Sequence, residues 1–456
     1  MYFEQLSTPG LGCYSYIIGC PQAGVMAVLD PRRDIDAYLR VANENEMRVT
    51  HIFETHIHAD HVSGAQELRA VTGADIYIHE SSAVEYEVKK IKNMDWFTLG
   101  NAFIRALHTP GHTPNSVSLL ISDLSRHPDP QMIMTGDLLF VGDIGRPDLP
   151  GDELLDDQVV NLYNSLYVTL AKLPDYLEVY PAHGEGSLCG RGMSAKPSTT
   201  LGYERLANPM LQFTEFNAFK KAVLSDLPMR PQSFTGIINA NMNAAAQPEQ
   251  VSMDSALSAN QADRLQKAGA TLLDLRDALS YSAAHIPGSV NVDFTDGPRL
   301  NWVGVAVPPG VPLVLVLPSE YSYDAVRVEL RRIGYDTVKG WLKGGVDAWT
   351  QNGGEIQILP YISVPELRTR IDGKNPPVMI DVRSSGEFSN ANIKGAANLT
   401  FSQILEKDAL PIDSGTEAVI ICQSGFRAGV AASMLQARGY ERVSVLSGGM
   451  AEWNAA

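Results

Sequence analysis

Hydrophobic and polar positions divide the first 185 residues into short apolar runs separated by polar turns. Runs rich in Val, Ile and Tyr predict β-strands. The predicted strands are residues 14–20, 24–30, 49–56, 74–80, 103–110, 116–122, 132–140 and 177–184. Apolar residues at helical spacing predict helices over residues 32–47, 61–73, 153–172 and 202–225. Strands and helices therefore alternate along this part of the chain.

The rest of the chain contains a linker and an internal repeat. Residues 238–250 are small and polar without a clear apolar period, which predicts an inter-domain linker. After it, residues 272–292 align with residues 379–399, "RRIGYDTV" with "QARGYERV", and "LKGGVDAW" with "LSGGMAEW". Each copy has strands separated by helix-length segments, which predicts βα units on a parallel sheet. The predicted fold class is therefore α/β and multi-domain.

Composition narrows the possible partners. The chain has 456 residues and a net charge of −16 from 36 basic and 52 acidic side chains, without a Lys/Arg-rich block, which argues against nucleic acid and acidic membrane surfaces. We see no signal-peptide pattern and no apolar run long enough to cross a bilayer, so we expect a cytoplasmic protein. The cysteines, Cys13, Cys20, Cys189 and Cys422, form no CxxC pair, and we expect free thiols, with Cys13 and Cys20 in the core.

The segment "THIHADH" concentrates metal-ligating side chains. It places His56, His58, Asp60 and His61 within six positions. Imidazoles with a carboxylate suit Zn, Fe or Mn by ligand type alone. The segment predicts a metal site and leaves the metal open.

The segment "CQSGFR" follows an apolar run and precedes a helix that is expected to end at Gly439. Loop N–H groups, the helix N-terminus and Arg427 are expected to face Cys422, which favours a thiolate and can hold an anion. Such a thiolate can carry a sulfur atom as a persulfide. The predicted cradle residues are Gln423, Ser424, Gly425 and Phe426.

With "IDVRSSGEF" and "GGMAEW", this loop resembles the rhodanese sulfurtransferase family. The resemblance implies that Cys422 is the sulfur-carrying nucleophile and that the loop with Arg427 cradles it. We interpret Asp381 and Arg383 as structural supports. In the first copy Leu317 stands where Cys422 is expected, so that copy is predicted to be catalytically silent and to serve as a spacer or docking surface.

The first part of the chain resembles the metallo-β-lactamase superfamily. The matching segments are "THIHADH", "TPGHT" with His112, "TGDLLF" with Asp137 and "YPAHG" with His183. The resemblance implies an αββα sandwich with metal at one edge. One interpretation is a metal pair bridged by Asp137 that hydrolyses a thioester, as in glyoxalase II-like enzymes. The other is a single Fe(II) held by His56, His112 and Asp137, with open positions for substrate. His58, Asp60, His61 and His183 then become supporting residues or a second metal site.

Two features favour iron over zinc. "VGDIGRPDLPG" resembles the corresponding segment of persulfide dioxygenases, in which Arg146 could anchor the anionic part of a thiol substrate. Asp148 either orients that arginine or forms a plain salt bridge. A sulfurtransferase on the same chain can use the sulfite that such an enzyme makes. Cys189 is either reactive or a packed thiol, and Tyr180 is expected in the core although its hydroxyl could reach the site.

The whole chain thus resembles a persulfide dioxygenase–rhodanese fusion. The expected domains are a metallo-β-lactamase-fold dioxygenase over residues 1–245, a Cys-less rhodanese-like domain over 251–355 and an active rhodanese domain over 358–456. The expected reaction uses O2 and a glutathione, coenzyme A or similar persulfide to give sulfite and then thiosulfate. We expect a homo-oligomer. A non-catalytic persulfide sensor or sulfur carrier is a third interpretation.

Overall fold

The computed structural model describes residues 1–225, 227–243, 255–297, 299–318, 322–406 and 412–456. These residues divide into two compact units. The first unit contains two six-stranded sheets and the second contains two five-stranded sheets. The domain boundaries expected from the sequence remain a prediction.

The first sheet has the order β1-β2-β3-β4-β5-β6. β1 to β3 are antiparallel, and β3 to β6 are parallel. Its strands are β1 (Tyr2–Thr8), β2 (Cys13–Cys20), β3 (Val25–Leu29), β4 (Arg48–Phe53), β5 (Asp75–His79) and β6 (Lys89–Ile91). Nearly every residue of β2 is buried because both faces of the sheet are covered.

The second sheet has the order β12-β11-β10-β9-β8-β7. β10 and β11 are parallel, whereas the other pairs are antiparallel. Its strands are β7 (Trp96–Leu99), β8 (Ala102–His108), β9 (Val117–Asp123), β10 (Met132–Gly136), β11 (Glu178–Pro181) and β12 (Thr199–Thr200). The expected strand 132–140 therefore ends at Gly136, which has a left-handed φ of 53°.

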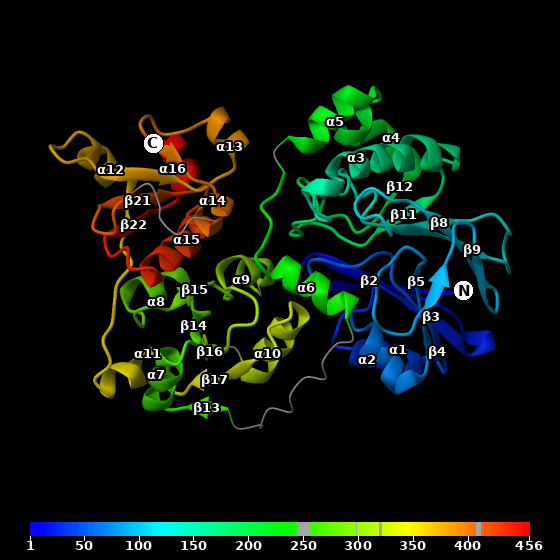
Figure 1. Ribbon diagram of the computed structural model, residues 1–456, viewed down its shortest axis with the longest axis horizontal. Helices are drawn as coiled ribbons and strands as arrows, with labels where there is room; N and C mark the ends of the chain where they lie inside the picture. Colours follow the sequence, from blue (N-terminus) through cyan, green and yellow to red (C-terminus); the bar gives the residue numbers. More distant parts are fainter. Residues whose placement is uncertain (226, 244–254, 298, 319–321, 407–411) are drawn as a thin grey trace. The chain divides into compact units, whose positions relative to one another are not determined.

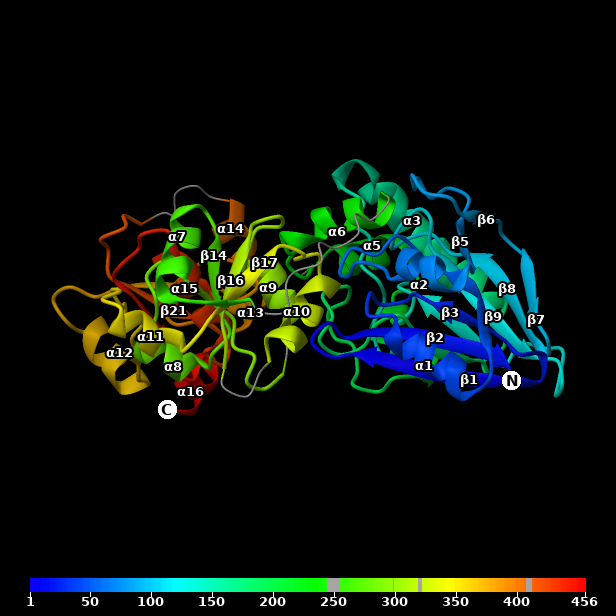
Figure 2. The same cartoon turned by 90° about the horizontal axis from the view of Figure 1, so that it is seen from below.

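The two sheets pack face to face, and helices cover their outer faces (Figures 1 and 2). Phe53 of the first sheet and Leu119 of the second belong to the core between the sheets. Helices α1 (Asp36–Glu44) and α2 (Ala65–Thr72) cover the first sheet. The second sheet is covered mainly by α3 (Leu155–Asn164) and α5 (Phe216–Leu224), with η3 (Ser165–Thr169), η4 (Leu170–Lys172) and α4 (Leu201–Ala207) alongside. This confirms the αββα sandwich.

Helix α6 (Ser233–Met242) corrects part of the linker prediction. Residues 238–242 belong to this helix, whereas 244–254 lie outside the described residues. Phe234, Ile237 and Asn241 are buried at helical spacing. The polar Asn241 interrupts the apolar pattern, which is why the sequence suggested a linker.

The second unit contains two similar parallel sheets, ordered β13-β17-β16-β14-β15 and β18-β22-β21-β19-β20. The first sheet uses β13 (Ala256–Leu257), β14 (Thr271–Asp274), β15 (Val290–Asn291), β16 (Leu313–Val316) and β17 (Val338–Leu342). The second uses β18 (Tyr361–Ile362), β19 (Val378–Asp381), β20 (Ala397–Asn398), β21 (Ala418–Ile421) and β22 (Val443–Leu446). The shared order confirms two rhodanese-like copies with parallel sheets.

Helices connect the strands of each copy. The first copy contains α7 (Ala259–Lys267), α8 (Ala278–Ala283), α9 (Leu300–Ala306), α10 (Tyr323–Arg332) and α11 (Gly345–Gln351). The second contains α12 (Val364–Ile371), α13 (Ser385–Asn390), α14 (Phe401–Glu406), α15 (Phe426–Ala437) and α16 (Gly449–Ala455). Among the described helices, none combines the length and the apolar character that a membrane span requires.

Candidate metal centre and sulfur loop

The predicted metal residues of the first unit follow the carboxyl ends of strands. His56 follows β4, Asp137 follows β10 and His183 follows β11, while His112 lies in the loop between β8 and β9. β10 and β11 are parallel, so their carboxyl ends meet at one edge of the sheet. The structure buries all seven predicted side chains, namely His56, His58, Asp60, His61, His112, Asp137 and His183.

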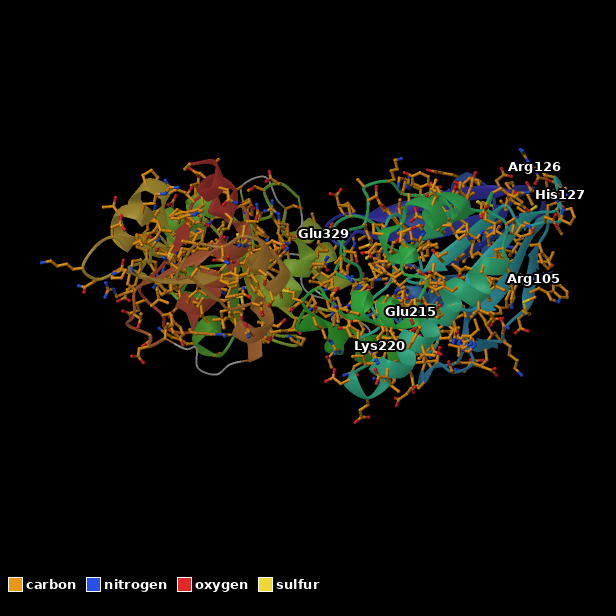
Figure 3. The ribbon with its side chains drawn as sticks, turned by 90° about the horizontal axis from the view of Figure 1, so that it is seen from above. Arg105, Arg126, His127, Glu215, Lys220 and Glu329 are labelled. Carbon is orange, nitrogen blue, oxygen red and sulfur yellow. The ribbon has the colours of Figure 1, made fainter. Side chains whose placement is uncertain are left out.

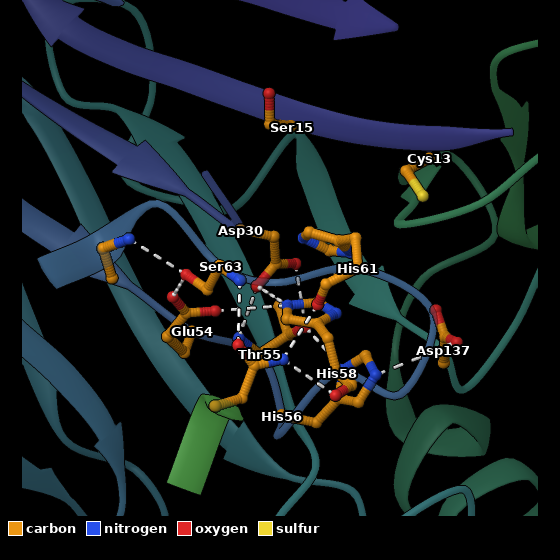
Figure 4. Close-up of polar contacts among 12 residues, drawn as sticks. Cys13, Ser15, Asp30, Glu54, Thr55, His56, His58, His61, Ser63 and Asp137 are labelled. Carbon is orange, nitrogen blue, oxygen red and sulfur yellow. Dashed lines mark hydrogen bonds and ion pairs between the residues drawn. The ribbon is translucent and has the colours of Figure 1, made fainter. Parts of the chain in front are cut away.

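Three of these residues offer ligand atoms to a common point, and we call them the metal group: His56, His112 and Asp137. Figure 4 shows His56 and Asp137 of this group. Asp137 Oδ2 lies 3.3 Å from His112 Nε2 and 3.8 Å from His56 Nε2. Among the described residues, His56 Nε2 and Asp137 Oδ2 are buried without a hydrogen-bond partner. Such atoms are costly unless something satisfies them. A bound cation would do so, and the metal group therefore fits a metal ion.

The protonation states of the metal group suit ligation. Burial lowers the pKa of His56 well below its usual value and also lowers the pKa of His112. Burial alone would raise the pKa of Asp137, but the nearby imidazoles of His183 and His112 bring it below its usual value. The site thus presents two neutral imidazoles and a carboxylate, which are the forms that bind metals.

Hydrogen bonds fix the orientation of both imidazoles. The Nδ1–H of His112 donates to the carbonyl of Arg146 at 2.8 Å. His56 Nδ1 lies 2.9 Å from Thr55 Oγ1, whose hydroxyl donates to Asp30 Oδ2 at 2.8 Å. His56 thus donates through Nδ1, which leaves the Nε2 atoms of both rings, 3.8 and 3.3 Å from Asp137 Oδ2, as free acceptors for a metal ion. Such supporting contacts raise the basicity of metal ligands and hold their geometry.

The second group, Asp60, His61 and His183, is bonded internally. Asp60 Oδ2 accepts from His183 Nε2 at 2.7 Å and from Cys13 Sγ at 2.8 Å. Asp60 Oδ1 lies 3.2 Å from His61 Nδ1. Burial alone would lower the pKa of His183, but the carboxylates of Asp137 and Asp60 raise it well above the usual value. Cys13 is buried as expected, yet its thiol meets this group.

The remaining histidine of the motif, His58, is held by acids that the sequence interpretation missed. His58 Nε2 lies 3.1 Å from Asp30 Oδ1 and 3.2 Å from Glu54 Oε2 (Figure 4). Asp30 also accepts the Thr55 N–H at 2.7 Å and has a left-handed φ of 47°. Asp tolerates that conformation better than most residues. An acid directly after the β3 strand run was the available signal.

The side chain of Asn241 in α6 binds the main chain of the motif. Its Nδ2 donates to the carbonyls of His58 and His61 at 2.9 and 2.8 Å. Its Oδ1 accepts the Ser63 N–H at 2.8 Å. This contact was not predictable, because Asn241 is far from the motif in the chain and lies in a segment whose pattern predicted a linker.

The segment around Arg146 lies against the metal group. Gly145 is required there, since a Cβ would lie 1.8 Å from the carbonyl oxygen of Asp137. Arg146 is buried and donates from Nε and Nη2 to Asp148 at 2.7 and 2.6 Å. Its Nη1 donates to the Leu188 carbonyl at 3.2 Å. These contacts stiffen the loop that contains the Arg146 carbonyl, which accepts the hydrogen bond from His112. A role for the Arg146 side chain in substrate binding remains a prediction.

The structure distinguishes the environments of Cys189 and Tyr180. Cys189 is buried, and its Sγ groups with ligand atoms of Asp137 and His183. Burial raises the pKa of Cys189 well above its usual value, which favours the thiol. Tyr180 packs beside the core between the sheets, and its hydroxyl donates to Glu178 at 2.9 Å.

In the second unit, Cys422 directly follows β21 and begins the sulfur loop, residues 422–427. The Gly425 N–H donates to Cys422 Sγ at 3.1 Å, and Gly425 has a φ of 103°. The "GGMAEW" segment holds the loop backbone, because the Met450 N–H donates to the Cys422 carbonyl at 2.8 Å. A Cβ on Gly449 would lie 2.3 Å from that carbonyl oxygen. Close approach therefore explains the glycine.

Two arginines, one within the sulfur loop and one beside it, each pair with a carboxylate. Arg427 donates from Nη1 and Nη2 to Glu387 at 2.8 and 2.6 Å. Arg383 is held by Asp381, with Nη2 at 2.7 Å from Oδ2, and its Nη1 lies 3.4 Å from Gln423 Oε1. From the sequence, Asp381 and Arg383 were interpreted as structural supports, whereas Glu387 was not foreseen as the partner of Arg427.

The first copy has the supporting Arg–Asp pair but lacks the cysteine and the second ion pair of the sulfur loop. Arg276 and Asp274 form the same fork as Arg383 and Asp381, with Nη2 at 2.6 Å from Oδ2. Leu317 directly follows β16, as Cys422 follows β21. By sequence alignment, Ser322 replaces the loop arginine and Ser280 replaces its glutamate partner. The thiol and the ion pair are thus absent together.

Comparison with known proteins agrees with this division of the chain. The metallo-beta-lactamase superfamily model matches residues 9–183, and the rhodanese-like domain model matches residues 258–352 and 363–456. A crystal structure of a metallo-beta-lactamase from Staphylococcus aureus subsp. aureus COL is similar at 30% identity and a TM-score of 0.66, covering 75% of this chain and 98% of that chain.

Curated relatives lie within the first unit's fold family. The persulfide dioxygenase ETHE1 of Bos taurus is 28% identical over 54% of this chain and 89% of its own length. A hydroxyacylglutathione hydrolase of Dictyostelium discoideum is 28% identical over 37% of this chain and 61% of its own length. With both folds, the metal group and the sulfur loop in place, the chain belongs to the metallo-β-lactamase superfamily and carries two rhodanese-like domains.

Proposed function

We propose that the first unit oxidises a low-molecular-weight persulfide to sulfite with one Fe(II), and that Cys422 transfers sulfane sulfur to sulfite to form thiosulfate. Among the observations on the site, one gives the strongest support for a single metal ion. Among the described residues, the unpartnered atoms His56 Nε2 and Asp137 Oδ2 both belong to the metal group, whereas Asp60 and His183 hydrogen-bond to one another; His58 Nδ1 is also unpartnered, outside both groups. Two imidazoles and a carboxylate with open positions are typical of non-haem Fe(II) oxygenases.

The residues of the metal group have distinct tasks. His56, His112 and Asp137 would hold the ion, and when bound, Fe(II) supplies the electron chemistry by which O2 reacts with a sulfur anion. Burial keeps both imidazoles neutral and excludes bulk water, and the neighbouring residues orient the two rings. The similarity to persulfide dioxygenase supports a thiol persulfide such as glutathione or coenzyme A persulfide as the substrate.

The two reactions balance as written. The first is R–S–SH + O2 + H2O → R–SH + SO3²⁻ + 2 H⁺. In the second, the Cys422 thiolate attacks the outer sulfur of another persulfide, the S–S bond breaks and R–S⁻ leaves. Sulfite then attacks the outer sulfur on Cys422, which yields thiosulfate and regenerates the thiolate. The Gly425 N–H that points at Sγ stabilises the negative sulfur in both steps.

Oxygen uptake with metal analysis tests the proposal. Protein purified without oxygen should contain about one iron per chain and consume O2 with glutathione or coenzyme A persulfide, while releasing sulfite. Cys422→Ser should stop thiosulfate formation and leave O2 uptake and sulfite release unchanged. A zinc pair without O2 uptake, or loss of both activities in Cys422→Ser, would contradict the proposal.

A thioester hydrolase is the second candidate. The observation in its favour is that Nδ1 of His183 in the second group lies 2.6 Å from Asp137 Oδ1, so the two groups adjoin as a dinuclear site needs, and a relative is a hydroxyacylglutathione hydrolase. Hydrolysis of a glutathione thioester by protein with two metal ions per chain would establish it. The sulfur loop then has no evident link to the reaction.

A further inference from the structure

Helix α15, which begins within the sulfur loop, is buried on all sides. Its residues Ala428 to Gln436 are all buried. A helix on a sheet normally buries one face and exposes the other. The corresponding helix of the Cys-less copy, α10, carries five charged residues among its ten. A second surface therefore covers the outer face of α15.

The Cys-less copy provides that surface within the same compact unit (Figure 1). The main-chain N–H of Asn291 in β15 donates to Ser433 Oγ of α15 at 3.0 Å, and both residues are buried. β15 and α9 both contact α15. The small side chains of α15 permit this close approach.

Two residues of the same copy contact Phe426 of the sulfur loop. The Arg299 Cζ lies 4.4 Å from the centroid of the Phe426 ring. The Trp302 ring in α9 meets it edge-on, with centroids 5.4 Å apart and an interplanar angle of 87°. Trp302 also contacts the Phe401 ring at 5.2 Å. We call Arg299 and Trp302 the aromatic clamp.

Arg299 is itself held in place. Its Nη1 donates to the Asp293 carbonyl at 2.9 Å, and its Nη2 donates to Asp296 Oδ2 at 3.2 Å. The Asp293 carboxylate lies 3.7 Å away. These acids offset the charge of the guanidinium, so its place over the ring suits holding Phe426 better than attracting an anion.

We propose that the aromatic clamp of the Cys-less copy positions the sulfur loop for transfer at Cys422, a role that rests on the proposed function. Phe426 directly follows Gly425, whose N–H donates to Sγ. Glycine at a φ of 103° leaves this peptide mobile unless its neighbour is held. By fixing Phe426, the clamp aims the N–H at the sulfur. The Cys-less copy is then half of the sulfur-transfer site, although it carries no nucleophile.

Four clamp variants of the full chain test this role. We expect Trp302→Ala and Arg299→Met to lower kcat for thiosulfate formation by about tenfold or more, because small misplacements of reacting groups are costly. KM for sulfite should stay within about twofold, since the clamp does not touch the anion. Trp302→Phe and Arg299→Lys should restore most of the activity. Arg264→Ala, an exposed arginine on α7 of the same copy, is the matched control.

A second readout separates positioning from mere stability. The rate of Cys422 alkylation is measured at one fixed pH, and the clamp variants should slow it because the sulfur loses a fixed donor. O2 uptake should not change. If folded Trp302→Ala and Arg299→Met match Arg264→Ala in kcat and in alkylation, the clamp is refuted. If the wild type forms no thiosulfate, the proposed function is wrong, and the alkylation rates still test the clamp. If Trp302→Ala does not fold, Arg299→Met alone tests it.

Discussion

Replacing Asn241 by alanine should destabilise the metal site from a helix outside the motif. Three hydrogen bonds to main-chain groups would be lost, of which those to His58 and His61 are buried and that to Ser63 is partly buried. Each is worth about 1 kcal/mol net, and removing the side chain leaves both carbonyls and the N–H without this partner. The expected loss in the free energy of unfolding is therefore about 3 kcal/mol.

The assay for Asn241→Ala is thermal unfolding together with iron retention. For a domain of this size, each kcal/mol lowers Tm by about 2–4 °C, so we expect the transition of the first unit to fall by about 6–12 °C. The dissociation of iron under a chelator should accelerate, because the motif backbone is less rigid. Sulfur transfer at Cys422 should not change.

Asn243→Ala is the matched control for this substitution. The Asn243 side chain is exposed and donates from Nδ2 to the Asn239 carbonyl at 2.7 Å, so its loss should cost less than about 0.5 kcal/mol. If Asn241→Ala unfolds at the same temperature as Asn243→Ala and retains iron equally well, the three contacts do not support the site, and the reasoning is wrong.

Three further predictions concern other parts of the chain. Gly449→Ala, whose Cβ would meet the Cys422 carbonyl, should reduce thiosulfate formation more than about tenfold and leave sulfite release intact; equal loss of both in product assays would contradict this. Asp60→Asn should leave about one iron per chain by metal analysis if the second group holds no metal, whereas a fall from two to one would support the hydrolase. Burial and then His108 lower the pKa of His79 from 6.5 to about 4, so the neutral form is favoured in the folded state. The contribution of His79 to the free energy of unfolding is present above pH 6.5 and is lost as pH falls through 4. His79→Gln should therefore flatten the fall in stability with pH over this range. The control His127→Gln, at an exposed position (Figure 3), should leave that fall unchanged.

Much of the fold could be predicted because each element repeats a local pattern. The β-rich runs predicted strands, the duplicated βα segments predicted the two parallel sheets, and the family resemblance implied the sandwich; the structure confirms both folds. Local patterns failed where a polar side chain replaced an apolar one. In α6, Asn241 occupies a core-facing helical position, and its partners lie in a distant loop, so the sequence around it predicted a linker.

The candidate site was predictable to the extent that its ligands lie in recognisable segments. The structure brings together the predicted His56, His112 and Asp137, although their roles remain a proposal. Residues that support them are single positions without a motif. Asp30 and Cys13 lie beside ordinary strand runs, and only the fold carries them to the ligands.

The loss of the thiol from the first rhodanese-like copy is consistent with retention of its fold. If that copy were only a spacer, the Arg276–Asp274 fork and the close contact of Asn291 with Ser433 would carry no constraint. The fork keeps β14 and the following loop rigid, and β15 next to it presents Asn291 to α15. A copy that has lost its nucleophile but covers the helix of its neighbour needs rigidity rather than reactivity. If the aromatic clamp holds Phe426 as proposed, changes at Arg299 or Trp302 affect the sulfur loop as directly as changes within the loop itself.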